Sequence, residues 1–373
     1  MPDGTVFVAT GDIPAMWLRD STWQVRPLLS MQPCAEVLQF LAAVSKRQAR
    51  YVLIDPYANA FNPEPNGKCW HRDFPDQDPW VFERKFEVDS LAAFLDLALR
   101  ISRTTGYREQ MDEVFWCAAR RVLRVCVAEL RHEMSTYRFV RPGAAAHDEL
   151  PNNGNGAPYA FTGMVWSGFR PSDDRCELPY LIPANAHLGV VLDWLAKDSQ
   201  CPGELADVAC GLALDINRSI EIVRRGDKVL PYEVDGLGRA RFLDDPNTPS
   251  LLSLPYLGWC PIEDKGYQAT RRWILSEQNP TFVCRGGVEG LASEHTPAGW
   301  IWPLSIAMRG LTTTDPDEIG ACLRTLEGLD GDTGDQHESV NPDDPRQFTR
   351  DWFSWADMTY VQLALASIGV HAK

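Results

Sequence analysis

Apolar residues recur at helical spacing along most of the chain, which predicts a protein built mainly of α-helices. Start signals support several of these helices, because Asp89-Ser90, Asp112 and Asp315-Pro316 stand where an apolar period begins. The convincing helical segments are 34–54, 89–103, 112–133, 184–197, 204–225, 264–276, 299–312, 315–329 and 353–369. Shorter helices are expected at 20–30 and 249–258.

Strand signals are rare by comparison. One β-hairpin is expected at 227–244, where the runs KVLPYEV and RARFL flank Gly236-Leu237-Gly238. No linker rich in glycine, serine or proline, no block of like charges and no low-complexity tract divides the sequence. We therefore expect residues 1–373 to form a single domain.

Two kinds of segment precede the helices, and the two kinds alternate. Segments dense in carboxylates, arginines and tryptophans lead into 20–30, 89–103, 184–197, 299–312 and 353–369, whereas plain polar segments lead into the helices between them. In a closed ring of helical hairpins, the loops before the inner helices gather at one mouth, and function tends to lie on such loops. An irregular helical bundle is the alternative architecture.

The helix count leaves this ring incomplete. If 249–258 is counted as inner, there are six inner helices and five outer ones, so we expect that the first outer helix is missing. Its loss would expose apolar side chains on the outward faces of 20–30 and 353–369, and such a patch favours association. The residues concerned are Val25, Leu28, Val361 and Leu365.

Composition narrows the classes of partner and the compartment. A net charge of −15 argues against nucleic acid, and no apolar run reaches the roughly 18 residues of a membrane span. The first residues, MPDGTVFVATGD, do not look like a signal peptide. The ten cysteines are scattered without a CxxC pair, so we interpret them mostly as small buried hydrophobes in a reducing compartment, and we expect a cytoplasmic location.

The charged and aromatic segments carry the candidate chemistry. Many of the thirteen tryptophans fall in or beside them, and flat aromatic faces next to hydrogen-bonding groups suit a pyranose sugar. Two carboxylate sites stand out, Asp173-Asp174 in GFRPSDDR and Glu338 in QHESVNPDD. Hydrolysis of a glycoside needs one protonated and one ionised carboxyl on opposite sides of the bond. The alternatives are a helix-initiating turn for the aspartates and a surface charge for Glu338.

Other catalytic classes lack their patterns. The segment His71-Arg72-Asp73, His295 and His337 could bind a metal, but no pair of them has ligand spacing, so no metal or other cofactor is expected. A serine hydrolase would need a GxSxG turn and a nucleotide-binding protein a GxxxxGK[ST] loop, and neither is present.

Longer motifs identify a family. The segments TGDIPAMWLRDS, ANAFN, WVFERKFEVDSL, GMVWSGFRPSDD, YLIPAN, SEHTPAGWIWPLSIAMRGLT and HESVNPDDPRQFTRDWFSWA run in order from residue 10 to about 365. They resemble glycoside hydrolase family 125, the exo-acting α-1,6-mannosidases. The resemblance implies an all-α (α/α)6 barrel, inversion at the anomeric carbon and no metal. By motif, Glu338 would be the general base, and Asp173 or Asp174 the general acid, with Asp173 preferred.

The same resemblance assigns the pocket. WLRDS looks like the WxRDS segment of glucoamylase-type barrels, in which the arginine and the aspartate hold sugar hydroxyls next to the cleaved bond. Arg19 and Asp20 would do so in this chain, and Trp17 would support them. An arginine close in sequence, Arg170 or Arg175, would keep the second aspartate of the pair ionised. The remaining expected pocket residues are Arg84, Glu87, Asp89, Arg170, His295, Trp302 and Arg350.

The function expected from these features is removal of terminal α-1,6-linked mannose from mannose oligosaccharides or trimmed N-glycans. One alternative keeps the barrel but changes the sugar or the linkage. Another is a catalytically inactive sugar-binding barrel, although such a protein would not need Glu338 together with both aspartates. A structural helical scaffold would not explain why charged and aromatic residues gather before alternate helices. The oligomeric state is left open.

Overall fold

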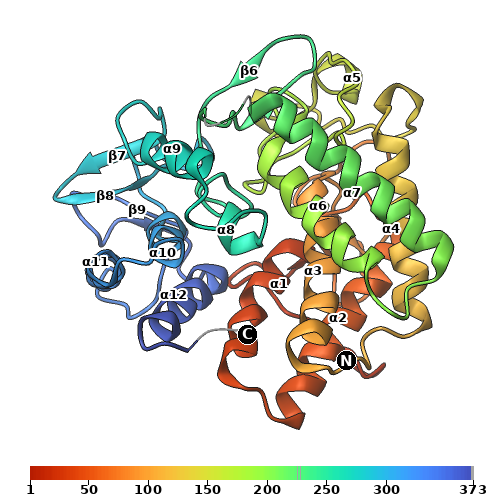
Figure 1. Cartoon of the computed structure of the whole chain (residues 1–373), viewed down its shortest axis with the longest axis horizontal. Coiled ribbons are helices and arrows are strands. Elements are labelled where there is room, and N and C mark those ends of the chain that lie inside the picture. The colour runs from red at the N-terminus through yellow and green to blue at the C-terminus, as the bar shows by residue number, and fades with distance from the viewer. Residues whose placement is uncertain (225, 227, 371–373) are drawn as a thin grey trace.

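The computed structural model describes residues 1–224, 226 and 228–370, and most of its regular structure is helical (Figure 1). The α-helices are α1 (Leu18–Val25), α2 (Ala35–Ile54), α3 (Val88–Thr105), α4 (Glu113–Glu129), α5 (Pro151–Gly154), α6 (Ile182–Ala196), α7 (Gly203–Arg224), α8 (Leu254–Leu257), α9 (Lys265–Ile274), α10 (Pro303–Leu311), α11 (Pro316–Glu327) and α12 (Ser354–Ser367). A 3₁₀ turn, η1 (Arg26–Met31), extends α1.

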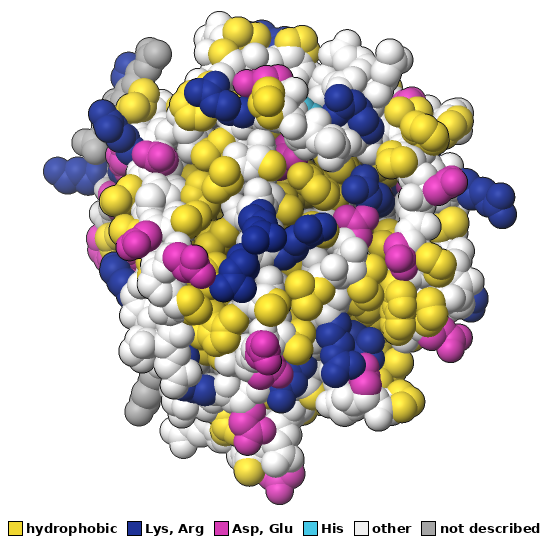
Figure 2. Space-filling model, turned by 90° about the vertical axis from the view of Figure 1, so that its right-hand side faces the viewer, with side chains coloured by type: hydrophobic (Ala, Val, Ile, Leu, Met, Phe, Trp, Pro, Cys, Tyr) yellow, Lys and Arg dark blue, Asp and Glu magenta, His cyan; other side chains and the backbone are white. Residues whose placement is uncertain are grey.

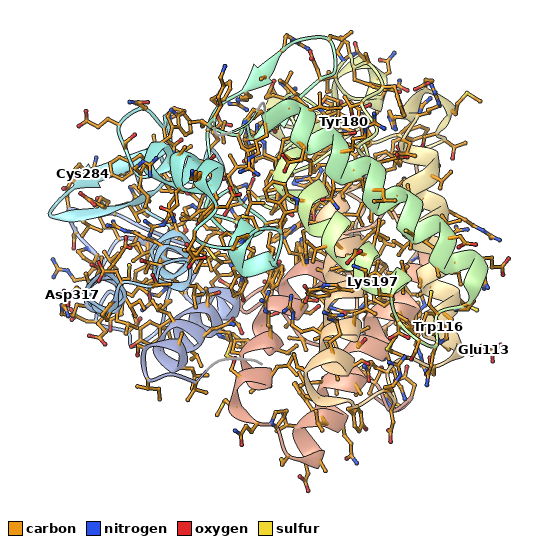
Figure 3. The ribbon with its side chains drawn as sticks, in the orientation of Figure 1. Glu113, Trp116, Tyr180, Lys197, Cys284 and Asp317 are labelled. Carbon is orange, nitrogen blue, oxygen red and sulfur yellow. The ribbon has the colours of Figure 1, made fainter. Side chains whose placement is uncertain are left out.

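The long helices agree with the apolar periodicity. Every convincing segment is confirmed as a helix, and no end moves by more than four residues. Two of the expected start signals are caps, since the side chains of Asp112 and Asp315 accept hydrogen bonds from the backbone of α4 and α11. Glu113 opens α4 in Figure 3. The third signal is wrong in detail, because Asp89 lies inside the first turn of α3 and pairs with Arg19.

Burial separates the helices into two groups. All eight residues of α1 are buried, and α3 and α6 are buried on every side over their first turns, whereas α2, α4 and α7 bury one face only. A helix that is apolar all round belongs inside a protein. α1, α3, α6 and α10, which follow charged and aromatic segments, are the more buried helices, as expected from the alternation. α12 also follows such a segment but buries one face only, through Trp355, Ala356, Thr359 and Leu363.

The helices that correspond to the expected inner helices contact one another in chain order. α1 packs against α3, α3 against α6, and α6 against α8, while α12 packs against both α10 and α1. A cluster that contains Leu257 of α8 and Leu304 of α10 connects the remaining pair. Figure 1 shows α10, α11 and α12 on one side of the molecule and α2, α4 and α7 on the other.

Short antiparallel strands precede several of the buried helices. They are β1 (Met16–Trp17), β2 (Ala60–Phe61), β3 (Val81–Glu83), β4 (Tyr180–Leu181), β5 (Glu233–Val234), β6 (Ala240–Arg241), β7 (Phe282–Arg285), β8 (Val288–Leu291), β9 (Ser339–Val340) and β10 (Phe348–Thr349). The expected hairpin is confirmed as β5 and β6, and β4 joins it in one sheet. The expectation of a single hairpin is wrong, because β7–β8 and β9–β10 form two more.

The apolar patch expected on the outward faces of 20–30 and 353–369 is only partly observed. Val25 is 3% exposed and belongs to the main hydrophobic cluster, so the expectation is wrong for this residue. The physical reason is that η1 packs against α12 while α1 contacts α2, and these contacts cover it. Leu28, Val361 and Leu365 are half-buried. A groove of about 820 Å³ between η1, α2, α3 and α12 is lined in part by Leu365.

The face in Figure 2 carries basic, acidic and apolar side chains in a mixed arrangement. In the described part of the chain, we find no helix of the length and apolarity that a membrane crossing requires.

All ten cysteines are free thiols. The expectation that most are buried is wrong, since only Cys126, Cys176 and Cys322 are buried and Cys34, Cys117, Cys210 and Cys284 are exposed.

Candidate active site

Backbone pairing brings the first charged segments together. β1 leads directly into α1 and pairs with β2, which pairs in turn with β3. This small sheet places Trp17, Glu83 and Asn59, the residue just before β2, near the start of α1 and α3. The backbone N–H of Leu18 donates to the carbonyl of Asn59 at 3.0 Å. Arg19, in the first turn of α1, therefore lies beside Glu87 at the start of α3.

The last charged segment joins the first through a glycine. Gly11 pairs with Phe353 and has a φ of 127°, and a Cβ at this position would lie 2.2 Å from the carbonyl oxygen of Trp352. Only glycine allows this approach. Arg350 then reaches across to Asp12, with Nε 2.7 Å from Oδ1. Residues from opposite ends of the chain thus meet at one site.

Arg19 lies at the centre of the cluster with four carboxylates around it. Its Nη1 is 2.5 Å from Glu87 and 3.3 Å from Asp89, its Nη2 is 3.3 Å from Asp173, and its Nε is 3.2 Å from Asp20. The guanidinium is 2% exposed. Because one guanidinium faces four carboxylates, the protonation of this cluster also depends on the neighbouring cations Lys85 and His295.

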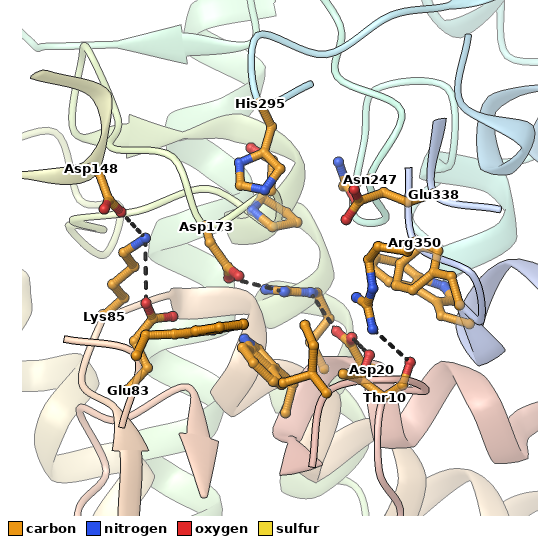
Figure 4. Close-up of a pocket in the computed structure, with 18 of the residues that line it drawn as sticks. Thr10, Asp20, Glu83, Lys85, Asp148, Asp173, Asn247, His295, Glu338 and Arg350 are labelled. Atoms are coloured by element: carbon orange, nitrogen blue, oxygen red, sulfur yellow. Dashed lines mark hydrogen bonds and ion pairs between the residues drawn. The ribbon is translucent and has the colours of Figure 1, made fainter. Parts of the chain in front are cut away.

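A cavity of about 270 Å³ opens above Arg19, slightly below the usual range for small-molecule sites. Asp173 and Glu338 enter it from opposite sides in Figure 4, with His295 between them. Eight of the residues expected at the site line it, namely Trp17, Arg19, Asp20, Asp173, His295, Trp302, Glu338 and Arg350.

The other expected residues lie outside the lining. Glu87 and Asp89 are buried behind Arg19. Arg84 turns away and pairs with Asp55 at 2.6 Å. Arg170 bonds to Glu233 at 2.6 Å and to Glu294 at 2.9 Å, so it supports the loop that precedes Asp173.

The paired aspartates point in different directions. Asp173 adopts a left-handed backbone conformation with φ at 64°, which aspartate tolerates better than most residues. Its carboxylate faces Arg19 and the cavity, whereas Asp174 is buried and bonds to Nδ1 of His295 at 3.2 Å. The expectation that Arg170 or Arg175 holds Asp174 is wrong, because Arg170 is engaged with Glu233 and Glu294 and Arg175 with Glu177.

Glu338 and His295, which both line the cavity, have shifted pKa values. Burial raises the pKa of Glu338, against the opposing influence of His295 and Arg350. Burial would lower the pKa of His295, but the carboxylates of Asp174, Glu338 and Asp173 outweigh it and raise this pKa to about 9. His295 is therefore an imidazolium at neutral pH and balances part of the negative charge.

Glu87 and Asp173 share one environment. Nδ2 of Asn59 lies 3.1 Å from Glu87 and 3.3 Å from Asp173, and the two carboxyl groups are hydrogen-bonded to each other. Burial and the charges of Asp173 and Asp89 raise the pKa of Glu87 well above its usual range, although Arg19 opposes this. Burial would raise the pKa of Asp173 too, but Arg19, Glu87 and Lys85 lower it. Of the two groups, Glu87 is therefore the one that keeps its proton to higher pH.

Sequence reasoning missed much of the lining. Trp70, Glu83 and Lys85 belong to charged segments and could have been named, whereas Asn247 comes from the loop DDPNTPS, which gave no signal. The lining residues not expected at the site are Thr10, Ile13, Trp70, His71, Glu83, Lys85, Arg141, His147, Asp148, Pro171, Ser172, Asn247, Phe353 and Trp355.

The candidate metal ligands do not converge. Asp73 accepts hydrogen bonds from Arg141, and His337 stacks on Phe348 with 3.5 Å between ring centroids. His71 lines the cavity. Within residues 1–224, 226 and 228–370, no group of three or more His, Cys, Asp or Glu side chains is arranged to hold a metal ion.

Known proteins are similar to this chain in sequence and structure. A solved structure from Streptococcus pneumoniae, a metal-independent α-mannosidase in a non-productive complex with α-1,6-mannobiose, is 45% identical with a TM-score of 0.96, covering 100% of this chain and 90% of its own. The meiotically up-regulated gene 157 protein of Schizosaccharomyces pombe is 37% identical over 96% of this chain and 76% of its own length.

A bacterial glucoamylase in complex with acarbose is 14% identical with a TM-score of 0.58, over 96% of this chain and 49% of its own, and this likeness concerns the fold alone. Residues 2–365 match the family of metal-independent α-mannosidases, GH125. The chain belongs to that family, glycoside hydrolase family 125.

Proposed function

We propose that this protein is an exo-acting, inverting α-1,6-mannosidase. The observation that carries the proposal is the pair of carboxyl groups, Asp173 and Glu338, on opposite sides of one small cavity. The linkage is supported by the S. pneumoniae structure, whose ligand is α-1,6-mannobiose. A small cavity favours attack at a chain end over attack within a chain.

Each carboxyl group takes one role. Asp173, which faces the cavity, protonates the glycosidic oxygen as it leaves, and Glu338 removes a proton from the water that attacks the anomeric carbon from the other side. His295, held by Asp174, keeps a positive charge near both of them. Asp174 is therefore a positioning residue, and we assign the general acid to Asp173.

The proton of the acid is supplied by the shared environment of Glu87 and Asp173. In the structure without sugar the proton is favoured on Glu87, since the pKa of Glu87 is raised and that of Asp173 is lowered. A sugar in the cavity excludes water from Asp173 and disfavours its charge. The proton then passes along the hydrogen bond to Asp173, which becomes the acid that the reaction needs.

The sugar-binding role expected for Arg19 and Asp20 from the WLRDS motif takes a modified form. The nitrogen atoms of Arg19 face Glu87, Asp89, Asp173 and Asp20, so Arg19 mainly holds carboxylates in place. Asp20 lines the cavity, accepts a hydrogen bond from Thr10 on Oδ2, and pairs through Oδ1 with Nε of Arg19 at 3.2 Å. We propose that Asp20 binds a sugar hydroxyl, and that Trp17, Trp302 and Arg350 shape the walls around it.

We also propose that the helices close into an (α/α)6 barrel. Support comes from the contact between α1 and α12 and from the likeness to the glucoamylase. Substrates derived from N-glycans are proposed because the family of the S. pneumoniae enzyme is linked to the processing of N-linked glycans. A cytoplasmic location stays a prediction.

The experiment that tests the function compares α-1,2-, α-1,3- and α-1,6-mannobiose as substrates, with free mannose as the readout. We expect release from the α-1,6 disaccharide and little from the others. Release of mannose from only one of the other disaccharides would favour the alternative in which the barrel is kept but the enzyme cleaves a different linkage. Binding of α-1,6-mannobiose without release would favour an inactive sugar-binding protein. Glu338→Gln is the control, because it removes the proposed base and leaves the size of the side chain unchanged.

A further inference from the structure

Trp70 is the unusual residue of the cavity wall. Its side chain is 52% exposed although it lines the cavity, whereas Trp17, Trp302 and Trp355 in the same lining are buried. Indole rings are large and mostly apolar, and they are highly buried on average. Trp70 thus presents an open aromatic surface at the edge of a site proposed to bind sugar.

Packing holds this ring in place. Trp70 stands edge-on to Phe82, with 5.6 Å between ring centroids, and Phe82 stands edge-on to Trp17 at 5.8 Å. Trp17 and Phe82 belong to β1 and β3 of one sheet, and both are buried. A row of aromatic rings therefore runs from the interior to the surface, and Trp70 is its outer member.

The wall that carries Trp70 lies on the side of the proposed acid. Glu83, next to Phe82 on β3, is paired with Lys85, and the charge of Lys85 acts on Asp173. Figure 4 shows Glu83, Lys85 and Asp148 on the Asp173 side of the cavity and Glu338 on the other. In the proposed mechanism the leaving sugar departs on the acid side, so the rest of the substrate passes this wall.

We propose that Trp70 is a stacking platform for the sugar residues on the leaving-group side of the cleaved bond. A pyranose ring has apolar C–H faces that pack on an indole, and its hydroxyls can bond to polar groups at the ring's edge. His71 and His147, which are exposed and also line the cavity, are placed to supply such bonds. The proposal rests on the mannosidase function and specifies where the remainder of a mannose oligosaccharide binds.

The test uses substrates with and without a sugar on the leaving side. Trp70→Ala should lower kcat/KM for α-1,6-mannobiose or α-1,6-mannotriose by about tenfold, the scale of one lost aromatic stacking contact. It should leave hydrolysis of α-mannosyl fluoride unchanged, since fluoride offers nothing to stack. Trp70→Phe should restore most of the oligosaccharide activity. Phe161→Ala is the matched control, because Phe161 is also 52% exposed and does not line the cavity.

Three results would overturn the platform. Equal kcat/KM of Trp70→Ala and the wild type on both oligosaccharides would show that no sugar stacks there. An equal fall on the fluoride and the oligosaccharides would show that Trp70 supports the fold of the site. A wild-type protein that hydrolyses none of the three substrates would remove the mannosidase proposal itself, a failure distinct from the first two.

Discussion

Replacing Asp173 or Asp174 with asparagine separates the roles of these two residues most sharply. Asp173→Asn removes the proposed acid but retains a side chain of the same size against Arg19. General acid catalysis contributes roughly 10²- to 10⁴-fold, so kcat on α-1,6-mannobiose should fall by about that factor. α-Mannosyl fluoride needs little protonation to leave, and its hydrolysis should stay within about tenfold of the wild type.

Asp174→Asn should behave differently. It weakens a charge-assisted hydrogen bond to His295, of the kind that contributes about 1.5–3 kcal/mol, or about tenfold to a hundredfold in rate. The His295 side chain is 35% exposed, so solvent screens its interaction with Asp174. The expected loss of rate is therefore nearer to tenfold than to a hundredfold. The loss should be the same on the disaccharide and the fluoride, because His295 acts on the charge of the whole site.

The assay is kcat on both substrates for both variants, with circular dichroism to confirm that each variant is folded. Rescue of Asp174→Asn by the fluoride, with no rescue of Asp173→Asn, would transfer the acid to Asp174. Equal losses for both variants on both substrates would leave neither aspartate as the acid.

Two further predictions follow from the buried charges. Glu87→Gln removes the group with the raised pKa, which in the proposal stores the proton for Asp173. Asp173 is then left among Arg19, Asp89, Lys85, His295 and the Cys176 thiol, where Arg19 and Lys85 still lower its pKa. The alkaline limb of kcat/KM against pH should therefore move to lower pH, and an unmoved limb would contradict the shared proton. Asp96→Asn leaves Arg100 and His187 without their buried partner, and urea unfolding at pH 7 should show a loss of about 3–5 kcal/mol. Burial would raise the pKa of Asp96, but Arg100 and His187 outweigh it and lower this pKa below its unfolded value near 3.9. The contribution of Asp96 to stability is therefore present above about pH 4 and lost on acidification. The two proteins should converge in acid, and a constant difference would refute the assignment.

Helices were predictable where local pattern and burial agree. The apolar period of 34–54 and the caps at Asp112 and Asp315 follow from nearest-neighbour physics, and each appears in the structure. The hairpin β7–β8 was missed although it had a signal, since Gly286-Gly287 separates two apolar runs and both glycines have positive φ. Asp89 could not be assigned correctly, because its partner Arg19 lies 70 residues away.

The site was predictable as a set of segments and less so as a set of contacts. Motif spacing named Asp173, Glu338 and Arg19 but did not show that Asp173 and Asp174 point apart, which depends on one left-handed backbone residue. Arg84 and Arg170 looked equally suitable in sequence, and only the folded chain shows them paired with Asp55 and Glu233 outside the lining. Long-range pairing of this kind leaves no local trace.

The measurement closest to the central claim is proton NMR of α-1,6-mannobiose during hydrolysis. We expect β-mannose to appear first and to convert slowly to the equilibrium mixture. The reason is that Glu338 directs water to one face of the anomeric carbon while Asp173 protonates the sugar that departs from the opposite face. First appearance of α-mannose, or no mannose at all from a folded protein, would contradict the inverting α-1,6-mannosidase proposed for this chain.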